Sequence, residues 1–446
     1  MKLCAQELKL ALPFWVSVLF AGSAGAALAD ESTQPSQGFL DGASLSVLSR
    51  NFYLNSDYRS PSPADKNYKQ EWAQGFIGAF ESGFTPGTFG FGLDAHGFLG
   101  LKLDGGKGHS GTGLLPVDAD GRSEDNYSSG GAALKIKASR TTVAFGEMMV
   151  ETPVFDTADK RLQPEYATGF LFNSREIDGM NLQAGHFTAF KNQDSSSSKD
   201  DFYGYGANTE AGGISFLGAD LFTQSPVGGA LYASELTDTW HQYYANLHLK
   251  QSGMFLDANV YHTQDTGQAL AGAIDNTAFS LSGKYTHDAH GFTLAYQKIN
   301  GDTPFDFVGG DSIYLANSIK YADFNGAHER SWQARYDLDL GPYGIPGLNF
   351  MTRYVKGSQI DGTHAPKGGA YNPFDETLGE YVPQQGDGGR HWERDIDLRY
   401  IVQSGSAKGL SVQLSHVSHR ANTPQAGDDI DRVYVVIQYP LSFGHL

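Results

Sequence analysis

The chain has 446 residues, of which 55 are glycine and 13% are aromatic, and its 32 basic and 50 acidic residues give a formal net charge of −18. Such an acidic chain lacks the basic surface expected of a nucleic-acid-binding protein. The mean hydropathy of −0.36 excludes a membrane protein built from helices. Abundant glycine and aromatic residues with only 18% charged residues are typical of β structure with many turns.

Residues 1–29 have the parts of a secretory signal peptide. Two early lysines precede an apolar run over 10–22, and Ala27-Leu28-Ala29 is a small-residue cleavage site. Cleavage there would start the mature chain at Asp30 and remove Cys4, the only cysteine. We therefore predict an exported protein with no disulfide and no thiol chemistry; the alternative is a buried N-terminal helix.

Alternation of apolar and polar residues with a period of two recurs along the rest of the chain. In 89–102, every second residue from Phe89 to Leu101 is apolar or small, and the residues between them include Asp94, His96 and Lys102. Segments around Trp332 and the final segment from Val433 repeat the pattern. This period predicts β-strands with one apolar and one polar face.

Two all-β architectures fit such strands, a secreted sandwich and a membrane barrel. Sandwich strands are often only about 5 or 6 residues long, whereas a tilted membrane strand needs roughly 9 to 11. The predicted segments match the longer class, and an export signal precedes them. In lipid an open sheet edge would leave backbone groups unpaired, so the sheet must close. We therefore predict an all-β fold, a transmembrane antiparallel β-barrel that fills residues 30–446 as a single porin domain.

The alternation predicts about 18 strands, a number typical of a barrel with a water-filled lumen. We place them at 42–54, 69–83, 86–103, 129–139, 141–150, 167–175, 179–190, 213–222, 227–237, 241–251, 254–264, 276–287, 290–299, 330–341, 346–357, 391–403, 409–419 and 430–441. Polar connections at 104–128, 191–200, 300–329 and 358–390 are predicted to be the long extracellular loops. The segment 151–166 mixes proline, apolar and charged residues, and we expect it to fold into the lumen and narrow it.

Motifs of catalysis and metal binding are missing from the mature sequence. It contains no G-x-S-x-G elbow, H-E-x-x-H pair, Walker loop or EF-hand loop. His416 and His419 are three apart and would face opposite sides of a strand, so they cannot chelate one metal unaided. We predict no catalytic residue, no cofactor and no metal site, although a serine, histidine and aspartate triad can never be excluded from sequence.

Basic residues on the predicted lumenal face are the remaining candidates for a functional site. A base at the middle of the lipid-facing surface would cost roughly 2–4 kcal/mol, so bases within strands are expected to point inward. Those are Lys135, Lys137, Arg335, Arg353, Arg399 and Arg432, while Lys160 and Arg161 lie on the narrowing segment. Such groups attract carboxylates, and arginine binds them bidentately. Alternatively, each base pairs with a lumenal carboxylate such as Asp337, Asp339, Asp395 or Asp397 and only holds the wall together.

Several stretches resemble the OprD family of outer-membrane porins of pseudomonads, also called the Occ carboxylate channels, and the resemblance covers essentially the whole mature chain. They include Glu71-Trp72-Ala73-Gln74-Gly75-Phe76, Gly310-Asp311-Ser312-Ile313, Ser331-Trp332-Gln333-Ala334-Arg335-Tyr336-Asp337-Leu338 and Tyr439-Pro440-Leu441-Ser442. The resemblance implies an 18-stranded, usually monomeric barrel. Its third extracellular loop forms an eyelet, and a ladder of basic residues leads carboxylates through it.

By position, the resemblance identifies Arg161 as the eyelet arginine, Asp311 as its acidic partner, and Arg50 and Lys69 as basic positions near the first strands. The chain also departs from the family pattern. Gln413 and Ser415 stand where relatives have two ladder arginines, and Tyr434 stands at another arginine position of the eyelet. Arg432 lies two residues from Tyr434 on the same face and could supply a displaced rung. Selectivity for basic amino acids is therefore not simply inherited.

Together these features predict an outer-membrane porin through which small carboxylates or amino acids diffuse passively. The expected partners are these solutes, outer-membrane lipid and lipopolysaccharide, and the barrel is expected to be monomeric or weakly oligomeric. Three alternatives stay open: a non-selective general pore, a serine-type hydrolase housed in an outer-membrane barrel, and an adhesive or structural barrel with a plugged lumen.

Overall fold

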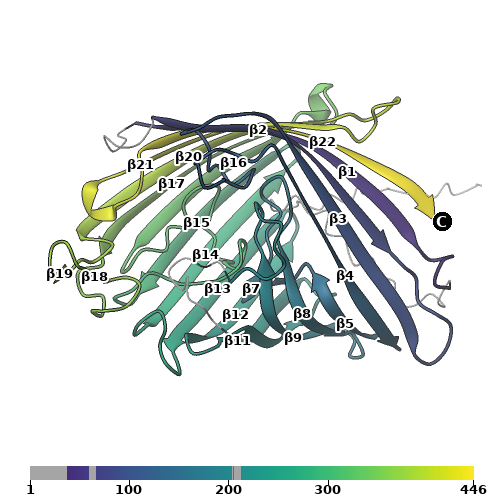
Figure 1. Ribbon diagram of the computed structural model, residues 1–446, viewed down its shortest axis with the longest axis horizontal. Coiled ribbons are helices and arrows are strands. Elements are labelled where there is room, and N and C mark those ends of the chain that lie inside the picture. Colours follow the sequence, from purple (N-terminus) through teal and green to yellow (C-terminus); the bar gives the residue numbers. More distant parts are fainter. Residues whose placement is uncertain (1–37, 60–66, 203, 205–211, 446) are drawn as a thin grey trace, which may run out of the picture.

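Eighteen antiparallel strands form one closed barrel in the computed structural model, which describes residues 38–59, 67–202, 204 and 212–445. Each strand pairs with its neighbours in the chain, and β22 pairs with β1 to close the ring (Figure 1). The barrel strands are β1 (Ser44–Tyr58), β2 (Tyr68–Glu81), β3 (Gly90–Gly105), β4 (Asn126–Ala138), β5 (Thr141–Met148), β8 (Tyr166–Ser174), β9 (Met180–Lys191), β10 (Ile214–Leu221), β11 (Val227–Leu236), β12 (Trp240–Gln251), β13 (Met254–Asp265), β14 (Asp275–His287), β15 (His290–Asn300), β16 (Arg330–Asp339), β17 (Leu348–Asp361), β20 (Asp387–Ile401), β21 (Ser411–Ala421) and β22 (Ile430–His445).

Each of the eighteen predicted segments overlaps one of these strands, so the fold predicted from the sequence is confirmed. Boundaries differ by a few residues. The segment predicted from 86 begins as a strand only at Gly90, because Gly87 turns the chain with a φ of 135°. Strand β1 continues to Tyr58, beyond the predicted end at 54. The predicted signal peptide lies outside the described residues.

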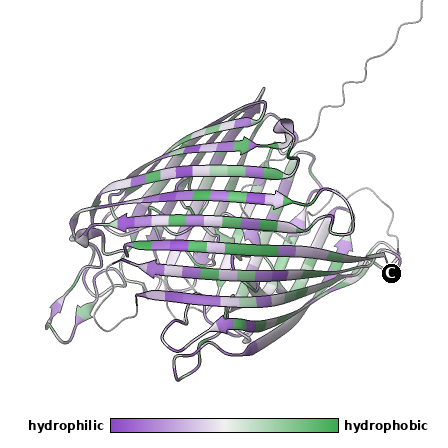
Figure 2. Cartoon of the chain, turned by 90° about the horizontal axis from the view of Figure 1, so that it is seen from above, coloured by the Kyte–Doolittle hydropathy of each residue, from purple (hydrophilic) through white to green (hydrophobic). Residues whose placement is uncertain are grey.

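Apolar side chains cover the outside of the barrel, as the period of two requires when the apolar face meets lipid. Leu217 is 66% exposed, Leu294 70% and Trp332 65%. Between such residues the strands place polar groups that point inward, and hydrophobic and hydrophilic bands alternate along them (Figure 2).

The connections differ sharply in length between the two ends of the barrel. At one end they are tight turns, such as 139–140, 252–253 and 288–289, and at the other end they run over 106–125, 301–329 and 362–386. Short periplasmic turns and long extracellular loops are typical of outer-membrane barrels. The described part of the chain has two helices, η2 (Gly341–Tyr343) and η3 (Thr423–Gln425), and neither could cross a bilayer.

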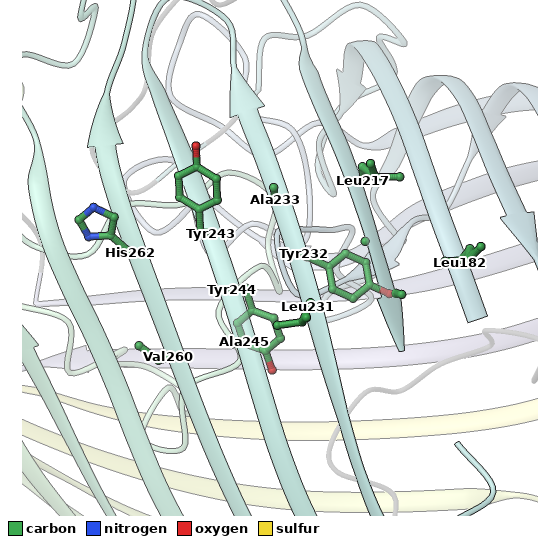
Figure 3. Close-up of a pocket in the computed structure, with 12 residues that line it drawn as sticks. Leu182, Leu217, Leu231, Tyr232, Ala233, Tyr243, Tyr244, Ala245, Val260 and His262 are labelled. Atoms are coloured by element: carbon green, nitrogen blue, oxygen red, sulfur yellow. The ribbon is translucent and has the colours of Figure 1, made fainter. Parts of the chain in front are cut away.

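A shallow apolar groove of about 620 Å³ lies on the outer surface over β9 to β13. Leu217, Leu231 and Tyr243 border it, and small residues such as Ala233 and Ala245 form its floor (Figure 3). The side chains that border the groove point to the lipid side, so it is not part of the route through the barrel.

Two long connections fold inward. Residues 149–165, here called the constriction loop, carry the short strands β6 (Glu151–Thr152) and β7 (Phe155–Asp156), and β7 is visible inside the barrel outline (Figure 1). Residues 301–329, here called the bracing loop, pack against them. Two other short strands, β18 (Phe374–Asp375) and β19 (Glu380–Tyr381), pair in a different long loop. The predicted inward fold of 151–166 is thus confirmed.

Candidate functional site

The constriction loop crosses the lumen, because contacts hold it to nearly opposite sides of the barrel. On one side the Tyr261 hydroxyl of β13 donates a hydrogen bond of 2.8 Å to the carbonyl oxygen of Pro153. Phe155 is fully buried there among aromatic side chains that include Phe187 and Phe305. On the other side the loop reaches β1 and β2, which lie eight and nine strands from β13 around the closed ring.

Arg50 of β1 fastens that second end. Its guanidinium donates to both carboxylate oxygens of Asp159, at 2.5 and 2.8 Å, and to the carbonyl oxygen of Arg161 at 2.7 Å. Leu162 packs beside Gly75, where an added Cβ would lie 3.0 Å from the leucine side chain. The Arg50 side chain is only 2% exposed. It therefore positions the constriction loop and does not present a free charge to the lumen.

The bracing loop holds the constriction loop from the other direction. The Glu165 carboxylate accepts hydrogen bonds from the backbone N–H of Ala158 at 2.8 Å and of Gly310 at 2.9 Å. Burial raises the pKa of Glu165 to about 7, although these two N–H groups act in the opposite direction. Tyr314 donates to the Asp156 carboxylate at 2.7 Å, and burial raises the pKa of that carboxyl well above its usual range.

Lys160 and Asp311 form an ion pair at this junction. The Lys160 ammonium also donates to the carbonyl oxygen of Gly310 at 2.7 Å. Burial tends to lower the pKa of Lys160, but the carboxylates of Asp311, Asp323 and Glu165 together outweigh it and the pKa is raised. The predicted acidic residue of the eyelet is therefore neutralised by its neighbour in the constriction loop.

Arg161 differs from Lys160 because no carboxylate lies within ion-pair distance of it among the described residues. Its guanidinium donates to the carbonyl oxygens of Lys160 at 3.1 Å and Thr112 at 3.3 Å. Burial lowers the pKa of Arg161, and the positive charge of nearby Arg432 acts in the same direction. Arginine stays charged despite such shifts. Arg161 is thus a lumenal cation close to a second cation.

Arg432 of β22 is that second cation, and its surroundings are aromatic. Its guanidinium lies 4.3 Å from the ring centroid of Tyr321, in the bracing loop, and 3.5 Å from the Tyr434 hydroxyl. Within the described chain it has no carboxylate partner, and its Nε has no hydrogen-bond partner. A solute carboxylate could find here two guanidinium groups and the Tyr434 hydroxyl, whereas the Tyr321 hydroxyl already donates to Asp428 at 3.3 Å.

Lys320 is a basic residue of the site that sequence reasoning missed. It projects from the bracing loop to the wall, where its ammonium lies 2.9 Å from Asp397 and donates to the Ser415 hydroxyl at 3.1 Å. The same ammonium lies 5.6 Å from the ring of Tyr434. No signal in the sequence shows where a long loop brings a lysine, so only the three-dimensional path of the loop reveals this contact.

Several predicted lumenal bases are paired with wall carboxylates, as the alternative interpretation expected. Arg335 binds Asp337 at 2.6 Å, Arg353 binds Asp395 at 2.6 Å, and Lys135 binds Asp94 at 2.6 Å. Lys135 and Lys137 also lie over the ring of Phe84, at 5.1 and 5.3 Å. Asp339 instead accepts from the Gly341 N–H of its own turn.

Two further bases of the wall have no carboxylate within ion-pair distance in the described ranges. Lys69 is exposed at the loop end of β2 and lies 5.9 Å from the Tyr58 ring. Arg399 donates to the Ser411 hydroxyl at 3.2 Å near the other end of β20. The register places them in sequence with Arg432. Arg432 on β22 and Lys69 on β2 both pair with Ser56 of β1, so these two bases are two strands, or about 10 Å, apart. Arg399 pairs with Gln413, which in turn pairs with Val436, four residues beyond Arg432 on β22. The row of Arg399 therefore lies about 13 Å closer to the short turns than the row of Arg432.

Comparison with known proteins shows which family this chain belongs to. The family model for outer-membrane porins of the OprD family matches residues 37–443. The chain belongs to the OprD family. It is 43% identical to Porin D of Pseudomonas aeruginosa, over 96% of this chain and 98% of that protein. The crystal structure of Pseudomonas aeruginosa OccK9 (OpdG) superposes with a TM-score of 0.82 at 35% identity, covering 91% of this chain and 100% of that one. That of Pseudomonas aeruginosa OpdK with vanillate gives 0.79 at 36%, with the same coverage.

This OprD-family chain is therefore an outer-membrane porin, a channel for small solutes, and its relatives are channels rather than enzymes. The resemblance expected from the sequence is confirmed. The structure brings Arg161, Arg432, Tyr434, Lys160 and Asp311 together at the constriction. It places Lys135, Lys137, Arg335, Arg353, Arg399 and Lys69 along the wall and Arg50 behind the constriction loop.

Proposed function

We propose that this porin selects small carboxylates, including amino acids, by passing them between Arg161 and Arg432. The observation that carries the proposal is that these two guanidinium groups lie near each other with no carboxylate partner in the described chain. Most other lumenal bases are already neutralised, for example Arg353 by Asp395. Because the whole protein carries a net charge of −18, an anion would find attraction only where such free cations gather.

The surroundings of Arg432 favour weak and reversible binding. A guanidinium can bind a carboxylate with two parallel hydrogen bonds, and the Tyr434 hydroxyl can donate another. A channel needs several such sites that hold the solute loosely enough for it to leave. Lys69 on the loop side and Arg399 on the turn side supply the next cations along the wall.

Lys320 compensates, in this proposal, for the basic residues that the sequence lacks on β21. Gln413 and Ser415 stand where the family resemblance implies arginines, and the Lys320 ammonium reaches Ser415 from the bracing loop. Its ion pair with Asp397 reduces its net charge, so its contribution should be smaller than that of Arg161.

The relatives support a carboxylate as the solute class. OpdK was crystallised with vanillate, an aromatic carboxylate. The phenol rings of Tyr321 and Tyr434 at the constriction could pack against an aromatic ring of this kind. Passage of aromatic carboxylates through this chain is therefore a specific part of the proposal.

Single-channel recording in a planar bilayer tests the proposal directly. We expect small openings that aliphatic or aromatic carboxylates interrupt, and interruptions that become shorter in Arg161→Gln. Arg335→Gln is the matched control, because that arginine is already paired with Asp337. Openings indifferent to every solute would support a general pore, and no openings from folded protein would support a plugged barrel. Turnover of an ester that a serine substitution abolishes would support a hydrolase.

We also propose that residues 1–29 are a signal peptide that is cleaved on export and, from the family resemblance, that the mature barrel is monomeric or weakly oligomeric. Support comes from the sequence of this segment and from the barrel, whose first strand begins at Ser44. N-terminal sequencing of protein from outer membranes should start at Asp30. At low concentration, the mass of the detergent-solubilised protein should correspond to one chain.

A further inference from the structure

Four neighbouring strands carry basic residues on the outer surface of the barrel, near the long loops. They are Lys298 of β15, Arg330 of β16, Lys356 of β17 and Arg394 of β20. Lys298 is paired directly with Arg330 in the register. Lys356 pairs with Trp332, which is two residues along from Arg330, and Arg394 pairs with Tyr354, two residues along from Lys356. With strands about 4.8 Å apart, the four positions form one diagonal stripe roughly 15 Å wide.

The four basic side chains point to the lipid side, because each lies an even number of residues from an exposed apolar residue of its own strand. Trp332 is 65% exposed and stands two residues from Arg330, and Tyr354 and Ile396 stand in the same relation to Lys356 and Arg394. On β15, β16 and β17 the cation follows the last aromatic or apolar outward residue on the loop side, whereas on β20 Arg394 stands between the outward residues Ile396 and Trp392. Arg330, Lys356 and Arg394 are themselves exposed.

No carboxylate lies within ion-pair distance of these four cations in the described ranges. The neighbouring outward base Arg420 shows the contrast, because it pairs with Asp431 at 2.8 Å, and Arg59 binds the same carboxylate. Unpaired cations directly above an aromatic belt cannot lie in the hydrocarbon without a cost of roughly 2–4 kcal/mol each. Their place must be the level of the lipid headgroups.

The stripe is confined to one side of the barrel. On three other strands the corresponding outward positions carry uncharged or weakly basic residues: His241 follows Tyr243 on β12, Thr277 follows Phe279 on β14, and Gln70 follows Trp72 on β2. On β21 the outward base Arg420 is neutralised by Asp431. A general need for solubility would spread such cations around the rim. Their concentration over β15 to β20 indicates a localised ligand.

We propose that Lys298, Arg330, Lys356 and Arg394 form a docking surface for the phosphate groups of the glycolipid in the outer leaflet, the lipid A part of lipopolysaccharide. Charge complementarity selects this occupant: a protein with a net charge of −18 meets an anionic leaflet, and these cations offset the repulsion where they gather. The acyl chains would lie over the exposed side chains of Trp332, Tyr354 and Ile396. This surface is separate from the lumen and from the proposed solute route.

Binding to refolded protein tests the proposal, because refolding into detergent supplies a barrel free of bacterial lipid. The mature chain is titrated with lipid A in micelles, with the same lipid after removal of its phosphates, and with inorganic phosphate, while tryptophan fluorescence is recorded. The variant is Arg330→Gln/Lys356→Gln. The control is Lys250→Gln/Lys408→Gln, which removes two exposed lysines near the short turns.

We expect the variant, which lacks two bases, to raise the half-saturating concentration of lipid A about 25-fold, and the control to leave it unchanged, since each base near an anionic surface contributes about fivefold in affinity. Dephosphorylated lipid should bind the parent as weakly as lipid A binds the variant. Equal binding by parent and variant, or by both lipids, would overturn the proposal. Binding of inorganic phosphate at the same concentration would indicate a simple anion site and would also overturn the proposal. If the double variant does not fold, Lys356→Gln alone should show a smaller shift of the same sign.

Discussion

The guanidinium of Arg50 and the carboxylate of Asp159, 109 residues apart in the chain, meet through two hydrogen bonds of 2.5 and 2.8 Å. Both side chains are almost completely buried, at 2% and 3% exposure. This pair fixes the end of the constriction loop that carries Arg161, so the position of the proposed selective cation depends on it.

Replacing Arg50 with alanine should therefore loosen the constriction loop. Removal of one partner leaves a buried carboxylate without its charge partner, which typically costs about 3–5 kcal/mol. We expect noisier channel openings and a lower free energy of unfolding in urea. Arg50→Ala/Asp159→Ala should recover part of the stability, because no lone charge remains, but not the quiet openings. Steady openings of parental conductance in the single variant would contradict the proposed positioning role.

Replacing Arg161 with alanine should widen the constriction and remove one of the two free guanidinium groups. We expect higher conductance together with slower uptake of carboxylates relative to neutral sugars, measured by swelling of proteoliposomes. Arg335→Ala serves as the control, because its partner Asp337 lies on the same strand and away from the constriction. An equal change in uptake of carboxylates and sugars would show that Arg161 limits the size of the pore and does not select charge.

The barrel could be predicted from the sequence because each strand carries its own evidence. The alternation around Trp332 is complete within a single strand, and the outward exposure of that residue follows from it. The pairing of Arg353 with Asp395 could almost be predicted as well, since both residues lie in predicted strands and the sequence lacks only the register between those strands. Local patterns therefore suffice for the wall of the pore.

The constriction could not be predicted in the same way, because loops bring together residues without any period. Lys320 contacts Asp397 and Ser415 across 77 and 95 positions of the chain, and nothing in the sequence marks its direction. From the sequence, Arg161 is predicted to be the eyelet arginine and Arg50 a basic position near the first strand, and neither prediction says whether the charge is free or paired. Only the path of the constriction loop separates a buried anchor from an unpaired cation.

The junction between the two inner loops should lose stability as pH rises. The pKa of Glu165 is about 7 in the folded protein, above the usual value of 4.5. A carboxyl with a raised pKa favours folding below its unfolded pKa, and this contribution disappears as pH rises through the folded pKa. The window is thus about pH 4.5 to 7, with an upper limit of about 3 kcal/mol. Thermal unfolding of the parent should weaken across it.

Glu165→Gln separates this effect from other titrations, because the amide keeps an acceptor for the N–H groups of Ala158 and Gly310 but does not ionise. Its unfolding should therefore depend less on pH than that of the parent. Asp156 also has a raised pKa, so a residual slope of the same sign should remain in Glu165→Gln and fall further in Asp156→Asn/Glu165→Gln. Parallel pH profiles for parent and both variants would contradict the assignment.

An arginine at Val435 should prevent efficient assembly of the barrel. Val435 pairs with Tyr53 on β1 and with Leu414 on β21, and all three side chains share the outward parity of their strands. A basic residue on the lipid face costs roughly 2–4 kcal/mol near the middle of the bilayer. Gln413→Arg is the matched control, since Gln413 points to the lumen beside Arg399. Heat-modifiable mobility on gels reports folding: Gln413→Arg should yield a normal folded fraction and Val435→Arg a reduced one. A normal folded fraction for Val435→Arg would place that side chain away from lipid.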